Sequence, residues 1–240
     1  MTKGLAMLEV RDLHAQYGDS RVLFGIDLSV PTRGGVALLG RNGAGKSTLM
    51  KSLLDAGPQS RGEVRLDGQP LAGLPTEARA RLGLALVPED RRIFTTPTVR
   101  QNLELAWHAA GKDRPRMQVA EVVALFPMLA TLLDRLGYQL SGGQQQLVAV
   151  ARGLMASPKL LMLDEPAEGL APKVAHDLAR EVRAARDKLG LTVLVAEQSV
   201  AYARQCTEHV YLLDSGTLVF SGDWAAFDAN PELKTRYLAV

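Results

Sequence analysis

The sequence predicts an α/β fold: a core with a mixed sheet, an antiparallel β layer and an inserted α-helical subdomain. The apolar runs at residues 36–39 and 160–163 show no alternation, and strands that are apolar on both faces lie in parallel sheets covered by helices. Shorter runs before residue 31 alternate in part, which predicts the antiparallel layer. These runs are residues 7–10, 22–24 and 26–30. Helical periods dominate residues 90–157, so this stretch is expected to be the helical insertion.

The expected domain organisation is one domain over residues 1–240, since this length suits a single α/β domain that carries a subdomain. Its core is expected to comprise residues 1–89 and 158–240, and the helical subdomain residues 90–157.

Composition excludes several classes of protein. Apolar residues make up 47% of the chain and its net charge is only +2, so we expect a folded protein with no nucleic-acid partner. The single cysteine, Cys206, rules out an intrachain disulfide and is expected to be a small buried residue. No apolar run approaches the roughly 20 residues of a membrane span, and residues 1–6 lack the apolar region of an export signal. A cytoplasmic location is expected, unless a partner holds the chain at a membrane.

Apolar periodicity and turn residues predict the other elements. The expected strands are residues 62–67, 84–87 and 192–196, with a hairpin at residues 211–220. The expected helices are residues 49–54, 76–82, 173–189 and 224–238. Thr76 is a candidate N-cap. The apolar stripe of the third helix is Val174, Leu178, Val182, Ala185 and Leu189.

A glycine-rich loop follows the first apolar strand and matches the pattern G-x-x-x-x-G-K-[ST]. Its residues are Gly40, Arg41, Asn42, Gly43, Ala44, Gly45, Lys46, Ser47 and Thr48. Glycines allow backbone N–H groups to turn toward a phosphate chain, and the helix start that follows adds a favourable dipole. Lys46 would reach the outer phosphates and Ser47 would bind Mg²⁺. An ordinary glycine turn would leave the Lys46-Ser47 register unexplained.

Two carboxylates, Asp164 and Glu165, end the second apolar strand, where open α/β sheets place their ligands. One carboxylate can hold Mg²⁺ through water, and the other can orient or deprotonate an attacking water. The alternative is a solvated acidic loop, which the glycine-rich loop upstream makes the weaker interpretation.

A second anion-binding helix start is expected at residues 140–146, where Ser141, Gly142 and Gly143 precede three glutamines. A single nucleotide does not need two such ends from one chain, which indicates a site shared across a dimer. A simple helix cap is the alternative. Tyr17, before a turn of the antiparallel layer, could stack on a flat base, although a turn tyrosine more often packs against its neighbours.

Together, Tyr17 and residues 40–48, 140–146 and 160–165 resemble, in order and spacing, the ATP-binding subunits of ABC transporters. The resemblance implies the ABC ATPase fold, with Tyr17 on the adenine, Lys46 and Ser47 on phosphates and Mg²⁺, and Glu165 as general base. Asp164 is then left for the metal. It also implies a head-to-tail dimer, in which two ATP molecules lie between residues 40–48 of one subunit and residues 141–143 of the other.

Two positions depart from the family pattern. Glu89 stands where a glutamine usually senses Mg²⁺ and the membrane partner, and Gln198 stands where a histidine usually contacts the γ-phosphate. A carboxylate can still bind the metal and an amide can still donate to a phosphate, so both residues remain site candidates. The departures leave open a regulatory module that binds ATP without turnover. A soluble ABC ATPase of DNA repair or translation is a further alternative, although this chain lacks their usual long insert or fused second ATPase.

The subfamily signal lies in residues 87–94, 164–172, 196–198 and 236–238. These stretches resemble the ATP-binding subunits of branched-chain amino-acid importers, and urea and amide importers share much of the pattern. The expected partners are a second ATPase subunit, identical or different, and membrane permease subunits, with a substrate-binding protein acting indirectly. The chain would then lie at the cytoplasmic side of the membrane.

Residues 91–94 are two arginines followed by Ile93 and Phe94, at the boundary between the core and the helical subdomain. The family resemblance places the groove for a permease helix here. Aromatic and arginine side chains are typical interface anchors, so Phe94 is expected to dock a partner. The alternative is that Ile93 and Phe94 pack inside the subdomain.

Overall fold

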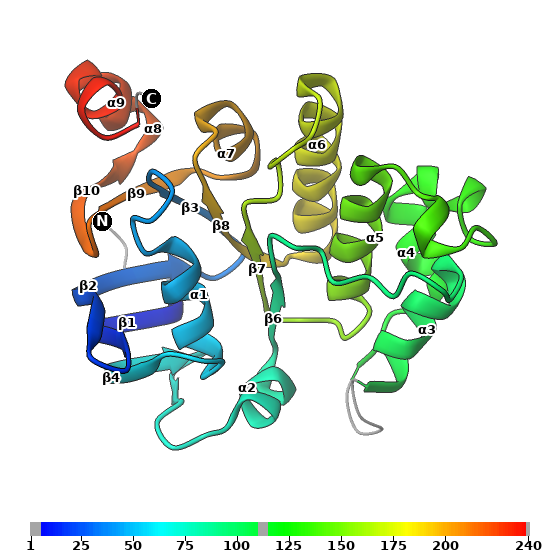
Figure 1. Cartoon of the computed structure of the whole chain (residues 1–240), viewed down its shortest axis with the longest axis horizontal. Helices are drawn as coiled ribbons and strands as arrows, with labels where there is room; N and C mark the ends of the chain where they lie inside the picture. Colours follow the sequence, from blue (N-terminus) through cyan, green and yellow to red (C-terminus); the bar gives the residue numbers. More distant parts are fainter. Residues whose placement is uncertain (1–5, 110–114, 239–240) are drawn as a thin grey trace.

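The computed structural model describes residues 6–109 and 115–238 of the chain. Residues 1–5, where no export signal is expected, and residues 110–114 of the expected subdomain lie outside the described residues. Two sheets, with helices between and around them, make up the fold (Figure 1).

The antiparallel layer is a four-stranded sheet of order β2-β1-β4-β5, which confirms the layer predicted ahead of the glycine-rich loop. Its strands are β1 (Ala6–Tyr17), β2 (Ser20–Pro31), β4 (Gln59–Leu66) and β5 (Gln69–Pro70). The three short runs read from the sequence are parts of two long strands. Shifts of register between Val10 and His14 break the alternation of β1 and explain why its length could not be read from periodicity.

The second sheet has six strands in the order β10-β9-β3-β8-β7-β6. These are β3 (Gly35–Leu39), β6 (Leu84–Val87), β7 (Leu160–Asp164), β8 (Thr192–Glu197), β9 (His209–Asp214) and β10 (Thr217–Asp223). All pairs are parallel except β9 and β10, which form the predicted hairpin, so the sheet is mixed. Every residue of β3, β7 and β8 is buried, as their continuous apolar character predicts.

Helices cover both faces of this second sheet (Figure 1). Helix α1 (Lys46–Leu54) lies between the two sheets and packs into one core with the antiparallel layer. Helices α6 (Pro172–Leu189) and α7 (Val200–Cys206) lie on the opposite face. In α6 the middle of the predicted stripe is buried, but Val174 and Leu189, near the two ends of the helix, are 41% and 43% exposed.

The predicted helical stretch contains α3 (Val99–Ala109), α4 (Val119–Leu125) and α5 (Gly142–Leu154). Short 3₁₀ turns at Pro127–Thr131 and Gly137–Gln139 connect α4 to α5. The side chains of Phe126, Leu129 and Leu147 join this unit to the core that also includes α6. None of the helices in the described part of the chain combines the length and apolar character needed to span a bilayer.

Two local predictions are wrong. Thr76 is the first residue of α2 (Thr76–Leu82) and not its N-cap; Pro75 holds that position, and the Thr76 hydroxyl donates to the Asp55 carbonyl. The expected last helix is two helices, α8 (Trp224–Asp228) and α9 (Pro231–Tyr237). Pro231 separates them because proline restricts the residue before it to non-helical backbone, and Asn230 has φ −120° and ψ 74°.

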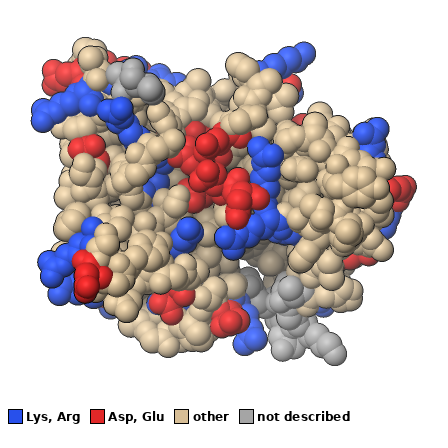
Figure 2. All heavy atoms as spheres, viewed as in Figure 1, with Lys and Arg blue, Asp and Glu red and all other residues tan. Residues whose placement is uncertain are grey.

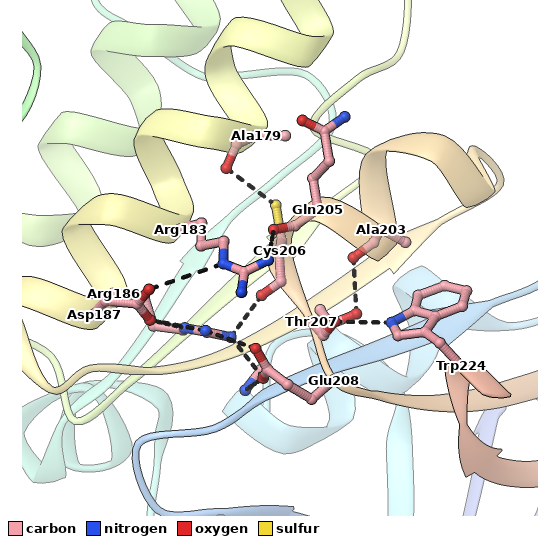
Figure 3. Close-up of polar contacts among 11 residues, drawn as sticks. Ala179, Arg183, Arg186, Asp187, Ala203, Gln205, Cys206, Thr207, Glu208 and Trp224 are labelled. Atoms are coloured by element: carbon pink, nitrogen blue, oxygen red, sulfur yellow. Dashed lines mark hydrogen bonds and ion pairs between the residues drawn. The ribbon is translucent and has the colours of Figure 1, made fainter.

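Arg186, in the last turn of α6, contacts the end of α7 and Glu208, the residue before β9 (Figure 3). Its guanidinium donates to both carboxylate oxygens of Glu208, each at 2.7 Å, and to the Cys206 carbonyl at 2.8 Å. Glu208 in turn accepts the Gly35 N–H, at the start of β3. Cys206 is buried, as predicted, and burial raises the pKa of its thiol to about 12. This cluster therefore fixes the last turns of two helices against the first residue of a central strand.

Candidate functional site

The glycine-rich loop connects the carboxyl end of β3 to α1, the order that its motif requires. Gly45, with φ +110°, is the residue before α1, and a side chain would be strained in this left-handed conformation. A Cβ on Gly40 would lie 2.5 Å from the Leu213 carbonyl oxygen. The loop therefore needs these two glycines to pass close to β9 and to begin the helix.

A cavity of about 330 Å³ opens above this loop. Its lining comprises Val22, Asn42, Gly43, Gly45, Lys46, Ser47, Thr48, Glu89, Glu165 and Glu168. Most of the predicted loop residues thus line this cavity. Of the four predicted site residues with a carboxyl or amide side chain, Glu89 and Glu165 line it and Asp164 and Gln198 do not. Tyr17 is not among the lining residues either.

Lys46 is almost completely buried, and its ammonium contacts three oxygens. It donates to the carbonyls of Gly40 and Arg41 at 2.7 and 2.9 Å, and it lies 2.8 Å from Glu165 Oε1. An ammonium has three donors, so all of them are in use. Lys46 and Glu165, which lie on elements far apart in the sequence, form an ion pair at the floor of the cavity.

Asp164 is the last residue of β7 and is 2% exposed. Burial raises the pKa of its carboxyl group, a hydrogen bond from Ser47 opposes this, and the charges of Glu165 and Glu89 add to the rise. Its Oδ1 atom is buried and has no hydrogen-bond partner among the residues that the structure describes. A buried carboxylate oxygen beside a hydroxyl suits a divalent cation, which would supply the missing countercharge.

Acidic side chains alone would not complete the coordination of a metal ion bound at Asp164. Among the described residues, no group of three or more His, Cys, Asp or Glu side chains is arranged to hold a metal ion. Mg²⁺ in nucleotide sites is commonly held by one or two protein ligands together with water and substrate phosphates. The pairing of Ser47 with Asp164 fits that mode of binding.

Glu165 has the left-handed backbone conformation, with φ +48°, which is uncommon for a residue other than glycine. Its N–H donates to the Ala196 carbonyl at 2.9 Å, and its own carbonyl accepts from the Glu168 N–H at 3.0 Å.

Burial raises the pKa of Glu168, with the nearby Glu89 and Glu165 carboxylates as further causes. Acidic side chains gather near the centre of the face seen in Figure 2, with basic side chains beside them.

Glu197, at the end of β8, is a site residue that sequence reasoning missed. It is 2% exposed, and its carboxylate accepts the N–H groups of Ala167, Gln198 and Ser199 at 2.8, 3.1 and 3.0 Å. Burial raises the pKa of Glu197 to about 7. The available signal was an acidic residue that closes an apolar strand, the same pattern that drew attention to Asp164.

The remaining predicted residues border this centre or lie apart from it. Gln198 follows Glu197 directly and is half-buried. Tyr17 ends β1 and is 43% exposed, with its ring 3.8 Å from the place of a Cβ on Gly57. Tyr17 therefore presents a ring to solvent on the antiparallel layer.

The second predicted anion-binding end is the start of α5. Ser141 caps the helix: its hydroxyl accepts the Gln144 N–H at 3.4 Å, and the Gln144 side chain accepts the Ser141 N–H at 3.0 Å. Ser141, Gly142 and Gly143 line a different cavity, of about 400 Å³, together with Leu170 and other residues of the loop before α6. One chain thus holds its two candidate phosphate-binding ends in separate cavities.

A third cavity, a groove of about 440 Å³, lies between α2, β6 and α5. Arg91 and Arg152 are among its lining residues. The Nη1 atom of Arg152 is buried and finds no hydrogen-bond partner within residues 6–109 and 115–238, and burial lowers the pKa of this guanidinium. Phe94 is 51% exposed, with its ring centre 5.4 Å from the Arg152 guanidinium carbon. Ile93 is partly buried and packs against the core that the helical subdomain shares with α6, whereas Phe94 is not part of that core.

Comparison with known proteins assigns the family. The model of the ABC transporter family matches residues 23–168. The chain is 36% identical over 232 residues to the high-affinity branched-chain amino acid transport ATP-binding protein BraG of Pseudomonas aeruginosa, covering 97% of this chain and 99% of that one. It is 35% identical to a probable branched-chain amino acid transport ATP-binding protein, LivF, of Archaeoglobus fulgidus, covering 90% and 92%.

Other matches show how broad the family is. The lipopolysaccharide export system ATP-binding protein LptB of Haemophilus influenzae is 30% identical, with 98% of each chain covered. The ADP conformation of MJ1267, an ATP-binding cassette of an ABC transporter, superposes with a TM-score of 0.79 at 25% identity and covers 94% of each chain. The chain therefore belongs to the ABC transporter family, as an ATP-binding subunit that hydrolyses ATP.

Proposed function

We propose that this subunit powers the import of branched-chain or related amino acids through partner membrane subunits. The observation that carries the proposal is the 36% identity to BraG over 97% of this chain and 99% of BraG. The ATPase does not contact the cargo, so the substrate class rests on this likeness and on the subfamily stretches in the sequence. The likeness to LptB marks the competing possibility, a different cargo carried with the same ATPase design.

Nucleotide binding is assigned to the loop of residues 40–48. Its backbone N–H groups would receive the phosphates, and Lys46 would exchange the Glu165 carboxylate for a phosphate oxygen. Ser47 and Asp164 would hold Mg²⁺, with Glu89 at the cavity wall as a further oxygen donor. When bound, the ion neutralises charge on the outer phosphates. Tyr17 is proposed to stack on the adenine ring.

Hydrolysis is assigned to Glu165 and Gln198. Once Lys46 has moved to the phosphates, Glu165 is free to accept a proton from the water that attacks the terminal phosphorus. The side-chain amide of Gln198 can donate to the terminal phosphate, a role that needs only an N–H donor. The products are ADP and inorganic phosphate.

A dimer is part of the proposal because Ser141, Gly142 and Gly143 lie in another cavity of the same chain. In a head-to-tail dimer this helix start would cover the nucleotide bound by the partner's loop. The partner is either a second copy or a different ATPase subunit.

The permease is proposed to dock at the groove beside Phe94, between the core (residues 1–89 and 158–240) and the helical subdomain (residues 90–157). Two observations support this docking site: the exposed aromatic ring of Phe94, and the Nη1 atom of Arg152, which has no partner in the described part of the chain. A substrate-binding protein would act on the permease from the other side, and this subunit would lie at the cytoplasmic face of the membrane.

Expression with its natural membrane partners tests the proposal. We expect the tagged chain to copurify with permease subunits, and vesicles containing the complex to accumulate labelled leucine when ATP is supplied. Accumulation of urea in place of leucine would assign the complex to the urea and amide importers. Purification of the chain without any membrane protein would contradict a transport role.

A further inference from the structure

Glu197 is a buried acid that touches several parts of the ATPase site and has no role in the mechanism above. It closes β8 between the strands that carry the glycine-rich loop and the two carboxylates. Its backbone carbonyl accepts the N–H of Gly40, the first loop residue, at 3.3 Å. Its side chain therefore lies at the point where the site's segments meet.

The Glu197 carboxylate joins two loops that lie 30 residues apart in sequence. Oε1 accepts the N–H of Ala167, two residues after Glu165, at 2.8 Å. Oε2 accepts the N–H groups of Gln198 and Ser199, at 3.1 and 3.0 Å. The loop that follows Glu165 and the backbone of Gln198 are thus bonded to the two oxygens of one carboxylate.

The contact to Ala167 matters for the conformation of Glu165. Glu165 holds a left-handed backbone conformation, and such strained conformations persist only where the surroundings fix them. Two backbone hydrogen bonds act directly on Glu165, and the bond from Ala167 to Glu197 anchors the next turn of the same loop. Release of that anchor would allow the loop to relax away from the strained conformation.

Both side-chain oxygens of Glu197 act as hydrogen-bond acceptors in these contacts. Three backbone N–H groups donate to the carboxylate, and the charge of Glu165, a second acid, acts on it as well. An amide has one acceptor oxygen and an NH₂ group, so a glutamine would face at least one N–H with a donor. The three N–H groups favour the ionised form of Glu197, and burial opposes it.

We propose that Glu197 is a positioning residue for ATP hydrolysis, which holds the Glu165 loop and the Gln198 loop at a fixed separation. The inference rests on the proposed roles of Glu165 and Gln198. Nucleotide affinity depends mainly on the glycine-rich loop, whose side of the site keeps its contacts when Glu197 is changed. Loss of the Glu197 carboxylate should thus lower kcat and leave nucleotide binding nearly unchanged.

The test compares Glu197→Gln with Ser199→Ala in the purified full-length chain. Ser199→Ala removes the hydroxyl that caps α7 through the Tyr202 N–H but keeps every contact of Glu197. Kd is measured with a trinitrophenyl ATP analogue, kcat and KM by phosphate release, and Tm by thermal unfolding. We expect Glu197→Gln to lower kcat about tenfold to a hundredfold, as small misplacements of catalytic groups do, while its Kd stays within about threefold. Ser199→Ala should keep kcat within about twofold, because neither loop is released.

An unchanged kcat in Glu197→Gln, whatever its Tm, would show that the Glu197 contacts do not position the groups that hydrolyse ATP and would overturn the proposal. An equal loss of kcat in Ser199→Ala would overturn it as well. If Glu197→Gln does not fold, Glu197→Asp decides: it keeps the charge but is too short to reach both loops, and we expect a lower kcat at an unchanged Kd. Absence of ATP hydrolysis by the parent chain would contradict the proposed function itself, a result separate from these.

Discussion

At the scale of single residues, the contacts of Lys46 indicate what a bound nucleotide would have to displace. Its three donors are saturated by two carbonyls of its own loop and by Glu165. The carbonyls cannot leave without rebuilding the loop, whereas the Glu165 side chain can rotate away. We expect nucleotide binding to break the ion pair, so that the arrival of the phosphates and the release of the proton acceptor are one event.

Glu165→Gln tests the assignment of the proton acceptor. Glutamine keeps the volume and one acceptor oxygen but cannot take a proton from water, and general bases contribute about 10²–10⁴-fold to rates. We expect steady-state ATP hydrolysis to fall by at least about 100-fold while ATP still binds. Phosphate release and equilibrium binding measure the two effects. Hydrolysis at the parent rate would exclude Glu165 as the base.

Part of the site could be predicted from sequence at this scale because its residues are adjacent in the chain. Lys46 and Ser47 are fixed by a local motif, and Asp164 and Glu165 by their place at the end of an apolar strand. Glu197 could not be assigned a role, since its contact to Ala167 depends on β7 and β8 being neighbours in the sheet. The neighbours of Glu168 in the cavity are likewise known only once the strands are placed.

At the scale of elements, the start of α5 is a capped helix end that is also proposed to bind a phosphate. Ser141 closes a reciprocal capping box with Gln144, which explains the helix boundary without any ligand. Its free N–H groups and the two glycines also suit an anion. The alternative of a simple cap, left open by the sequence, is thus structurally correct and does not exclude the phosphate role.

Ser141→Arg separates these two roles. In a head-to-tail dimer the arginine would occupy the space of the partner's terminal phosphate, so we expect ATP-driven dimerisation to be lost while the monomer still binds ATP. Loss of the cap should lower the free energy of unfolding by about 1 kcal/mol. Size-exclusion chromatography with ATP in a Glu165→Gln background measures dimerisation.

Ser141→Thr is the matched control, because threonine keeps the capping hydroxyl. It should dimerise as the parent does. If Ser141→Arg abolished nucleotide binding by the monomer, the two cavities would not act independently and the shared-site arrangement would be wrong.

Element boundaries were predicted well where periodicity is strong and poorly where tertiary contacts decide. The strands β7 and β8 lie within a residue of their expected ends. The length of β1 was missed because its alternation breaks at a bulge. The split between α8 and α9 was missed although Pro231 marks it, since the apolar residues on both sides continue a helical pattern.

At the scale of the whole molecule, the Arg186 cluster and the ATPase site lie at opposite ends of the same central strand. β3 begins at Gly35, which donates to Glu208, and ends next to the glycine-rich loop. We therefore expect the Arg186 cluster to contribute to the free energy of unfolding and to have no effect on the rate of ATP hydrolysis.

Arg186→Met tests that separation. The substitution removes a 5%-exposed guanidinium and its bonds to Glu208 and the Cys206 carbonyl, but Glu208 is half exposed and can be solvated. We expect the free energy of unfolding to fall by about 2 kcal/mol, which is less than the roughly 3–5 kcal/mol lost when a fully buried ion pair is broken. For a chain of this size the Tm should fall by about 4–8 °C. The kcat measured at 25 °C should match the parent.

Arg180→Met is the control on the same helix, since its ion pair with Asp177 is exposed and such pairs contribute little. Its Tm should change by less than about 2 °C. A Tm of Arg186→Met equal to that of the control would show that the cluster does not stabilise the fold.

The last prediction concerns the coupling of this subunit to a membrane partner through Phe94. The Phe94 backbone is held by Asn102, which accepts its N–H at 2.8 Å and donates to its carbonyl at 3.0 Å, so truncation of the side chain leaves these bonds in place. The ring is 51% exposed, so much of its surface is available to a partner, and its one described ring contact is to the Arg152 guanidinium. We expect Phe94→Ala to keep the ATPase rate and Tm of the isolated subunit, while the assembled transporter loses most of its uptake because a docking anchor is gone.

Leu189→Ala, which changes a similarly exposed apolar residue at the far end of α6, is the control and should leave uptake unchanged. ATP hydrolysis, thermal unfolding and vesicle uptake are measured on the same preparations. A fall of several degrees in the Tm of isolated Phe94→Ala would identify a packing residue and contradict the docking role.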